Sequence, residues 1–354
     1  MGGFTLGPIN LKINYNEILV MIGPTGSGKT TLLNLIAGLL EPDQGSIIID
    51  GLDITNKPVE SRRVGYTFQS PSLFPHLNVY ENIIFGLDKK GKKENNVHIM
   101  NFLKDLGISH LINRHIQGLS GGEMQKVSLA RMLVTKPKIM LMDEPLAHLD
   151  SPTKRRLRLD LRRILKTQRV PTIYVTHFEE DVYALADSVS TLHNGAIEYT
   201  EKLESILVNS SFSPSSSYSS SSFLSNVFTD GNYMEGKVVR SNAGVTIFNI
   251  GSHLLETLGN YRVGSKVGIF LRPEDIILSK ENVKTSARNV VRAKVTSITK
   301  QHKESGIANI HLLIDKFRIT ARITEESRTV LGIRNDDVIF AIFKASSPQV
   351  VREE

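Results

Sequence analysis

An apolar run that leads into a glycine-rich turn is the first place where this sequence could carry out chemistry. Ile18–Ile22 precedes residues 23–30, which fit the pattern G-x-x-x-x-G-K-[ST], and a helix-forming run follows over residues 31–39. Glycines let successive backbone N–H groups face one point, and a helix N-terminus adds partial positive charge, so the turn can cradle phosphate oxygens. In such a turn Lys29 reaches the β- and γ-phosphates and the Thr30 hydroxyl ligates Mg²⁺. The pattern predicts an ATP site formed by Gly23, Pro24, Thr25, Gly26, Ser27, Gly28, Lys29, Thr30 and Thr31.

Two adjacent carboxylates end another apolar run and supply what hydrolysis needs. Asp143 and Glu144 directly follow residues 139–142, and the carboxyl ends of parallel strands are where α/β sheets hold ligands. We expect Asp143 to orient Mg²⁺ through its water shell and Glu144 to polarise a water for attack on the γ-phosphate. Adjacent acids alone are common in turns, but in one chain with the glycine-rich turn they indicate a hydrolase.

A second helix N-terminus is also suited to an anion. This tip consists of Ser120, Gly121, Gly122 and Glu123, and its helix is predicted to run to about Val134. Ser120 is a good N-cap, and the glycines let an anion approach the exposed N–H groups. Because the first turn already holds a whole triphosphate, the second tip is predicted to complete the site of another copy of the chain.

These motifs resemble the ATP-binding subunit of ATP-binding cassette (ABC) transporters, an α/β P-loop NTPase. Residues 119–122 match the family signature; Glu123 is a common variant of its usual Gln, whereas Met124 and Lys126 depart from the usual Gln and Arg. The resemblance implies ATP and Mg²⁺ as cofactors and a homodimer of ATPase subunits.

Three further positions take their roles from the same resemblance. Gln69 resembles the Q-loop glutamine, which senses the γ-phosphate and Mg²⁺ and contacts the coupling helix of the membrane partner. Asp150 resembles the D-loop aspartate at the dimer seam, and His177 resembles the switch histidine that contacts the γ-phosphate. The implied catalytic set is Glu144, His177 and Gln69, and the implied Mg²⁺ ligands are Thr30, Gln69 and Asp143.

Residues 74–82 match the segment that follows the Q-loop in importers. The resemblance therefore implies transmembrane permease subunits and an external substrate-binding protein as partners, no nucleic acid, and a peripheral position on the cytoplasmic face of the cell membrane. The family stacks adenine on an aromatic residue upstream of Phe4, so no adenine-stacking residue is assigned.

Short apolar strands separated by helical patterns must position these motifs, and their alternation indicates a parallel α/β sheet. The strands are predicted at Ile18–Ile22, 64–68, 139–142, Thr172–Val175 and 189–192. Eleven of the sixteen residues from 210 to 225 are serine, and such a segment buries too little apolar area to offset its ordering entropy. The sequence therefore predicts a nucleotide-binding domain over 1–208, a flexible linker over 209–225 and a β-rich regulatory region over 226–354.

Alternating runs after the serine-rich stretch indicate a small all-β, OB-like module. They lie at 237–240, Val245–Ile250, 267–271, 291–298, Ile307–Ile314, 318–323 and Val338–Phe343. Residues 269–276 resemble the regulatory extension of importer ATPases, and residues from about 284 to 350 resemble the Mop/TOBE domain of molybdate-transport ATPases. A tetrahedral dianion needs hydroxyl and N–H donors with one or two cations, a mixture that Ser286, Arg288, Lys344 and Ser346 supply. Such a site would lie between two barrels; the alternative is an ordinary barrel edge that binds no ligand.

The composition excludes several other classes of protein. A net charge of +7, from 43 Lys and Arg against 36 Asp and Glu, is too small for a nucleic-acid coat. The absence of cysteine excludes disulfides, thiolate metal sites and a cysteine nucleophile, and it fits a reducing cytosol. No apolar run approaches the roughly 18 residues that span a bilayer.

Together these features predict the ATP-hydrolysing subunit of an importer, with molybdate or tungstate as the expected cargo. Importers of sulfate, polyamines, sugars or ferric ion share the architecture and are the alternatives. A soluble ABC ATPase that acts on DNA or ribosomes usually carries coiled-coil insertions or duplicated cassettes, and this sequence has neither. A non-enzymatic oxyanion-storage protein would not need Lys29, Asp143, Glu144 and His177.

Overall fold

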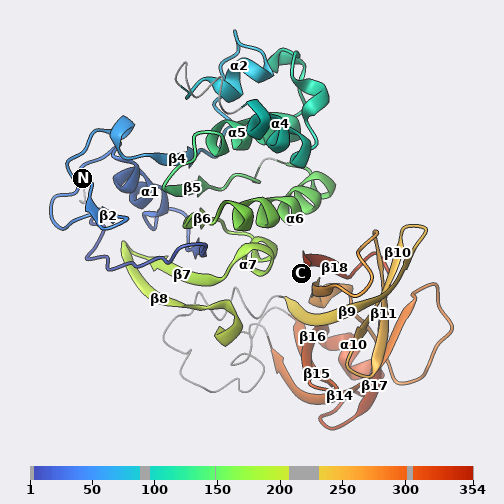
Figure 1. The fold of residues 1–354 in the computed structure, drawn as a ribbon. Helices are drawn as coiled ribbons and strands as arrows, with labels where there is room; N and C mark the ends of the chain where they lie inside the picture. Colours follow the sequence, from blue (N-terminus) through green and yellow to red (C-terminus); the bar gives the residue numbers. More distant parts are fainter. Residues whose placement is uncertain (1–3, 88–95, 148, 207–230, 301–305, 354) are drawn as a thin grey trace. The chain divides into compact units, whose positions relative to one another are not determined.

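A computed structural model describes residues 4–87, 96–147, 149–206, 231–300 and 306–353. The chain divides into two compact units, Met1–Leu203 and Glu204–Glu354 (Figure 1). The predicted linker over 209–225 lies outside the described residues, as does His148 of the D-loop segment. The linker and the domain boundaries proposed around it therefore stay predictions.

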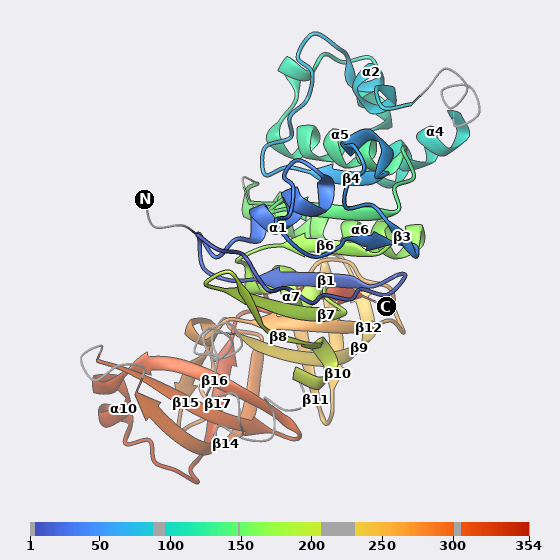
Figure 2. The ribbon, with the colours of Figure 1, turned by 90° about the vertical axis from the view of Figure 1, so that its left-hand side faces the viewer.

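The first unit is built on a six-stranded sheet with the order β4-β5-β6-β1-β7-β8. Its strands are β1 (Ile18–Ile22), β4 (Val64–Thr67), β5 (Ile139–Asp143), β6 (Thr172–Val175), β7 (Ser188–His193) and β8 (Ala196–Lys202). β8 runs antiparallel to β7, and the other neighbours are parallel. All five predicted strands are present, and β1, β5 and β6 are apolar runs because both faces of a parallel sheet are covered. Figure 2 shows these strands stacked from β4 to β8.

Helices cover the sheet and extend beyond its β4 edge. They are α1 (Lys29–Ala37), α2 (Val79–Ile84), α4 (Asn96–Asp105), α5 (Gly121–Leu133), α6 (Ser151–Gln168) and α7 (Glu179–Leu185). In Figures 1 and 2, α2, α4 and α5 lie together at the β4 end of the sheet. The described part of the unit also contains a two-stranded hairpin, β2 (Ile48–Ile49) with β3 (Leu52–Asp53), and three short 3₁₀ turns. Among the described residues, no helix combines the length and the apolar character needed to cross a membrane.

Packing of α1 on the sheet fixes the direction of its N-terminus. Leu32, Leu33 and Ala37 of α1 are buried in one cluster with Leu141 of β5 and Val175 of β6. The helix begins at Lys29, two residues before the predicted start. It ends because Gly38 takes a left-handed conformation (φ 83°) in which its N–H bonds back to the last turn.

The second unit consists of two five-stranded sheets, β11-β10-β9-β12-β18 and β13-β17-β14-β15-β16. The first sheet contains β9 (Asn232–Asn242), β10 (Val245–Ile250), β11 (His253–Leu258), β12 (Lys266–Leu271) and β18 (Gln349–Glu353). The second contains β13 (Ile277–Ser279), β14 (Asn289–Lys300), β15 (Ile307–Ile314), β16 (Phe317–Thr324) and β17 (Val338–Phe343), and one short helix, α10 (Glu325–Leu331), follows β16. One apolar core joins both sheets, and the terminal strand β18 pairs with β12. The predicted β-rich region is therefore a single structural unit.

Candidate nucleotide-binding site

The carboxyl ends of four neighbouring parallel strands deliver the predicted site residues to one edge of the sheet. Residues 23–30 follow β1, Asp143 ends β5 with Glu144 directly after it, and His177 follows β6. Gln69 comes two residues after β4, and its side chain is exposed. The strand order therefore brings together motifs that are spread over more than a hundred residues of sequence.

The glycine-rich turn has a backbone that side chains would disrupt. Gly26 and Gly28 have φ values of 83° and 104°, in the left-handed region that favours glycine. A Cβ atom on Gly23 would lie 2.1 Å from the Leu192 carbonyl oxygen, and one on Gly28 would lie 2.8 Å from the Phe4 ring. Lys29 bends back over the turn, and its Nζ donates to the carbonyls of Gly23 (2.8 Å) and Pro24 (2.9 Å).

Unsatisfied donors in this turn fit a phosphate ligand. The Ser27 hydroxyl is buried and has no hydrogen-bond partner among the described residues. No side chain caps the N-terminus of α1, so its first N–H groups are free to face an anion. Burial lowers the pKa of Lys29, whereas the nearby carboxylates of Glu144 and Asp143 oppose that shift. The turn is thus a concave, donor-rich surface with one cation beside it.

Thr30 and Asp143 form a pair that fits a magnesium ion. The Thr30 Oγ1 donates to Asp143 Oδ2 at 2.8 Å. Burial raises the pKa of Asp143, and the Thr30 hydrogen bond offsets only part of that effect. Mg²⁺ is usually held by one or two protein oxygens together with substrate phosphates and water. The Thr30 hydroxyl and the Asp143 carboxylate are oxygen ligands of this kind, and two of them are enough.

Glu144 and His177 meet at the mouth of the site. His177 Nδ1 lies 3.0 Å from Glu144 Oε1. The Glu144 side chain is 20% exposed and that of His177 is 53% exposed, so the carboxylate is sheltered while the imidazole is open to a ligand. Glu144 has a φ of 45°, a strained conformation for a non-glycine residue.

A buried polar network lies directly behind His177, and the sequence analysis missed it. Asp181 is 1% exposed and accepts hydrogen bonds from Arg158 (2.7 Å), Thr176 Oγ1 (2.8 Å) and the Tyr174 hydroxyl (3.2 Å). Thr176 Oγ1 in turn accepts from the Phe178 N–H at 3.1 Å. This network fixes the backbone on both sides of His177. The sequence carries no signal for it, because Arg158 and Asp181 belong to different helices.

The second helix tip is closed by its own side chains. The Ser120 N–H and hydroxyl both donate to Glu123 Oε2, at 2.8 and 2.9 Å, and the Glu123 N–H donates to Ser120 Oγ. These bonds lower the pKa of Glu123. A Cβ atom on Gly121 would face open space, whereas one on Gly122 would lie 2.7 Å from Thr153 Cγ2 on α6. The predicted helix thus begins as expected, with α6 beside it.

Asp150 takes the N-cap position of α6. Its carboxylate accepts from the Thr153 N–H at 3.1 Å, and this bond lowers the pKa of Asp150. The D-loop aspartate therefore has a structural role in the single chain in addition to the predicted place at a dimer seam.

The importer-type segment 74–82 contributes to an aromatic cluster. The buried Asn82 side chain accepts from the Phe74 N–H (2.8 Å) and donates to the Phe74 carbonyl (3.1 Å). The Phe74 and Phe85 rings are 4.3 Å apart, and the Arg131 guanidinium lies 5.4 Å from the Phe74 ring. Phe85 is 55% exposed. This cluster, which the sequence analysis did not single out, exposes the apolar ring of Phe85 a short distance along the chain from Gln69.

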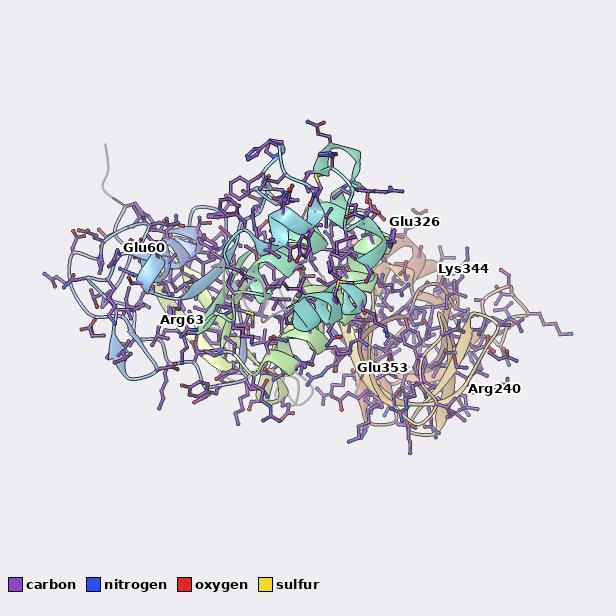
Figure 3. All side chains as sticks on the ribbon, turned by 45° about the horizontal axis from the view of Figure 1, so that its top comes forward. Glu60, Arg63, Arg240, Glu326, Lys344 and Glu353 are labelled. Atoms are coloured by element: carbon purple, nitrogen blue, oxygen red, sulfur yellow. The ribbon has the colours of Figure 1, made fainter. Side chains whose placement is uncertain are left out.

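The predicted oxyanion residues gather at one end of a strand pair in the second unit. Asn289 of β14 pairs with Phe343 of β17, so Arg288 and Lys344 flank the end of the same ladder. Both cations are exposed, as are Ser286 and Ser346; Figure 3 labels Lys344 on this unit. One chain therefore offers these groups on an open surface and does not enclose an anion.

Comparisons with known proteins agree with this arrangement. The ABC transporter family model matches residues 6–147, and the TOBE domain model matches residues 285–348. A molybdate/tungstate import ATP-binding protein of Pyrococcus horikoshii is 37% identical over 98% of this chain and 96% of its own length. A sulfate/thiosulfate import ATP-binding protein of Bacillus cereus is 34% identical over 95% of this chain and 91% of its own length. The solved structure of cbiO1 from Clostridium perfringens, part of an ABC transporter complex, matches with a TM-score of 0.54 and 29% identity over 58% of this chain and 85% of that chain.

The chain belongs to the ABC transporter family. The predicted fold class is confirmed: an ABC-type P-loop NTPase domain precedes an all-β region that contains a TOBE domain. The predicted enzyme class, an ATPase coupled to transport, and its binding of ATP are confirmed by the same family. The resemblance to the molybdate/tungstate type is likewise confirmed.

Proposed function

We propose that this chain hydrolyses ATP at a seam between two copies of itself and thereby drives import of molybdate or tungstate through permease subunits. One observation carries the hydrolysis: the glycine-rich turn, Asp143 and the Glu144–His177 pair share one sheet edge. The likeness to a molybdate/tungstate import ATP-binding protein over nearly the whole chain, together with the TOBE match, supports the cargo.

Binding of the triphosphate uses donors that the free chain leaves unused. The N–H groups at the start of α1 and the Ser27 hydroxyl donate to no side chain among the described residues, and they bind phosphate oxygens. Lys29 exchanges its two carbonyl partners, Gly23 and Pro24, for the β- and γ-phosphates, because charge-assisted hydrogen bonds are the stronger ones.

Magnesium, when bound, neutralises phosphate charge and fixes the γ-phosphate for in-line attack. Thr30 and Asp143 would hold it, and Gln69 is the third ligand that we propose from the Q-loop resemblance. Hydrogen bonding to Thr30 keeps the Asp143 carboxylate aimed at this position.

Glu144 acts as the general base. Its carboxylate takes a proton from a water molecule while the water oxygen bonds to the γ-phosphorus and the bond to ADP breaks, giving ADP and inorganic phosphate. His177, at 3.0 Å, orients the carboxylate and contacts the γ-phosphate. Because the imidazole is exposed, it can contact the γ-phosphate when ATP is bound and lose that contact after hydrolysis.

The Ser120 tip of a second copy completes the site. Phosphate oxygens replace the Glu123 carboxylate as acceptors for the Ser120 N–H and hydroxyl, and Asp150 lies at the seam. ATP thus joins two copies, and hydrolysis lets them part.

Permease subunits receive this motion at Gln69 and at the Phe74–Phe85 cluster. An exposed ring, that of Phe85, stacked on the half-buried ring of Phe74 beside a guanidinium suits a short helix that presents apolar side chains. We propose a peripheral position on the cytoplasmic face of the membrane and delivery of cargo by an external binding protein.

The hydrolytic role is tested with the Glu144→Gln variant of the full chain. We expect turnover to fall by about 100-fold or more, the usual contribution of a positioned base, while ATP affinity stays within about threefold. Nucleotide binding is measured with a fluorescent analogue, and hydrolysis by phosphate release. Normal hydrolysis by the variant would refute the role of Glu144.

The anion role is tested by calorimetry of the full chain with molybdate, tungstate and sulfate. We expect heat with the first two and its loss in the Arg288→Ala/Lys344→Ala double variant. Arg240→Ala removes an exposed cation elsewhere on the same unit, labelled in Figure 3, and should retain binding. Heat with sulfate alone would shift the cargo to sulfate, and no heat with any anion would remove the proposed site.

A further inference from the structure

The His177 imidazole needs a support that the buried network does not provide. Asp181 and Thr176 fix the backbone around His177, but the His177 side chain is 53% exposed. An exposed side chain samples its rotamers freely unless neighbours restrict it. Two contacts restrict this one: the carboxylate of Glu144 at 3.0 Å and the ring of Phe178, whose centroid lies 4.0 Å from that of the imidazole.

Phe178 is itself held by a cation from another element. The Lys154 Nζ lies 3.7 Å from the centroid of the Phe178 ring, well inside the range of about 6 Å for cation–π attraction. Both side chains are half-buried, which reduces competition from water. Lys154, Phe178 and His177 therefore form one stack that ends at Glu144.

The position of Lys154 connects the stack to the N-terminal ends of two helices. Lys154 belongs to the first turn of α6, and its N–H donates to the carbonyl of Asp150, the N-cap of that helix, at 2.9 Å. The next residue toward the N-cap, Thr153, contacts the position of Gly122 at the start of α5. These contacts connect the starts of α5 and α6 to His177 through Lys154 and Phe178.

We propose that Phe178 is a positioning residue for the His177 imidazole and that Lys154 holds Phe178, so that the start of α6 and the histidine reorient together. This inference rests on the proposed roles of Glu144 and His177. It predicts that loss of either member lowers the rate of hydrolysis without weakening ATP binding.

Steady-state hydrolysis by the full chain provides the test. We expect Phe178→Ala to lower kcat about tenfold and Lys154→Met about threefold, with KM for ATP within about twofold, because only the alignment of the base is lost. Phe178→Tyr and Lys154→Arg preserve the ring and the cation and should restore most of the rate. The double variant Phe178→Ala/Lys154→Met should be no slower than Phe178→Ala alone, since the two act as one unit.

A matched control comes from the second unit. Lys316 lies 5.4 Å from the centroid of the Phe317 ring, and Lys316→Met should leave kcat unchanged. Normal kcat in Phe178→Ala, or losses that multiply in the double variant, would overturn the inference; a changed KM with normal kcat would do the same. A thermal unfolding curve for each variant checks that the variant is folded. If Glu144→Gln is inactive while Phe178→Ala is normal, only this inference fails; if Glu144→Gln hydrolyses ATP normally, the proposed function fails first.

Discussion

The two helix tips that carry glycines, at the start of α1 and at the start of α5, are prepared for an anion in opposite ways. The α1 tip has no side-chain cap and leaves the Ser27 hydroxyl without a partner among the described residues. At the α5 tip, Ser120 and Glu123 form a complete capping box. One tip lies open in the single chain, and the other is satisfied by its own carboxylate.

This difference indicates an order of events. The α1 tip gains hydrogen bonds as soon as a phosphate arrives, because it gives up few existing ones. The α5 tip must exchange an internal acceptor for an external one, so its net gain is small. Nucleotide should therefore bind first at α1, and the second copy should close afterwards with modest affinity.

Removing the cation beside the open tip gives the largest expected effect. Lys29→Met should raise the Kd for ATP by at least about 100-fold, because it deletes two charged hydrogen bonds worth about 1.5–3 kcal/mol each. Equilibrium dialysis with ATP measures this. Lys138, which pairs with Asp50 on the surface, provides the control Lys138→Met, with unchanged affinity. An equal loss in both variants would contradict the open-tip model.

Neutralising the carboxylate at the closed tip should favour the dimer. In a Glu144→Gln background with Mg-ATP at low salt, Glu123→Gln should lower the dimer Kd about fivefold, since it removes repulsion between a surface carboxylate and phosphate. Sedimentation measures the Kd of the dimer. Glu81→Gln alters an equivalent capping box with Asn78 at the start of α2 and should leave the dimer unchanged. A weaker dimer with Glu123→Gln would show that the carboxylate assists closure.

Ser27→Ala should act with opposite signs on binding and on stability. The buried hydroxyl lacks a partner within the described part of the chain, so its removal should stabilise the nucleotide-free chain by about 0.5–1 kcal/mol and weaken ATP binding about threefold. Ser190, a buried serine whose hydroxyl lies 3.0 Å from Thr200 Oγ1, is the matched control. Ser190→Ala should lose stability and keep ATP affinity, as followed by thermal unfolding with and without ATP.

The smallest expected effect is the pH dependence of stability at Glu123. Hydrogen bonds from Ser120 lower the pKa of Glu123 below its ordinary value of 4.5. A carboxylate shifted in this direction stabilises the fold above its unfolded pKa, and that contribution disappears as the pH falls through the lowered, folded value. The unfolding temperature of Glu123→Gln should therefore be slightly below that of the unaltered chain near pH 7, and the two should converge as the pH falls through the lowered, folded pKa of Glu123. A difference that persists in acid would mean that the charge is not responsible.

Local pattern was enough to predict the elements that position the site. The extents of Ile18–Ile22, Val245–Ile250, Ile307–Ile314 and Val338–Phe343 agree with the structure, because a buried strand must be apolar throughout or on alternate residues. The motifs needed no distant contact to be seen, since each one is a short, continuous stretch.

Features that depend on distant contacts were not predictable. The strand β18 is short and pairs with β12 about eighty residues earlier. The sequence of β18 alone does not indicate which strand it pairs with. The ring of Phe178 and the ammonium of Lys154 meet only because α6 packs beside the loop that follows β6. The buried side chain of Asn289 bonds to the main chain of Glu256, a partner about thirty residues earlier that no local pattern indicates.

The left-handed backbone of Glu144 implies that the fold gives up stability at the position where it needs a base. Glycine adopts such a φ without the penalty of about 1–2 kcal/mol that other residues incur. Glu144→Gly and Glu144→Ala would both lack the carboxylate, yet the glycine variant should unfold at the higher temperature. The glutamate at this position therefore costs stability, and the proposed role of its carboxylate as the general base accounts for that cost.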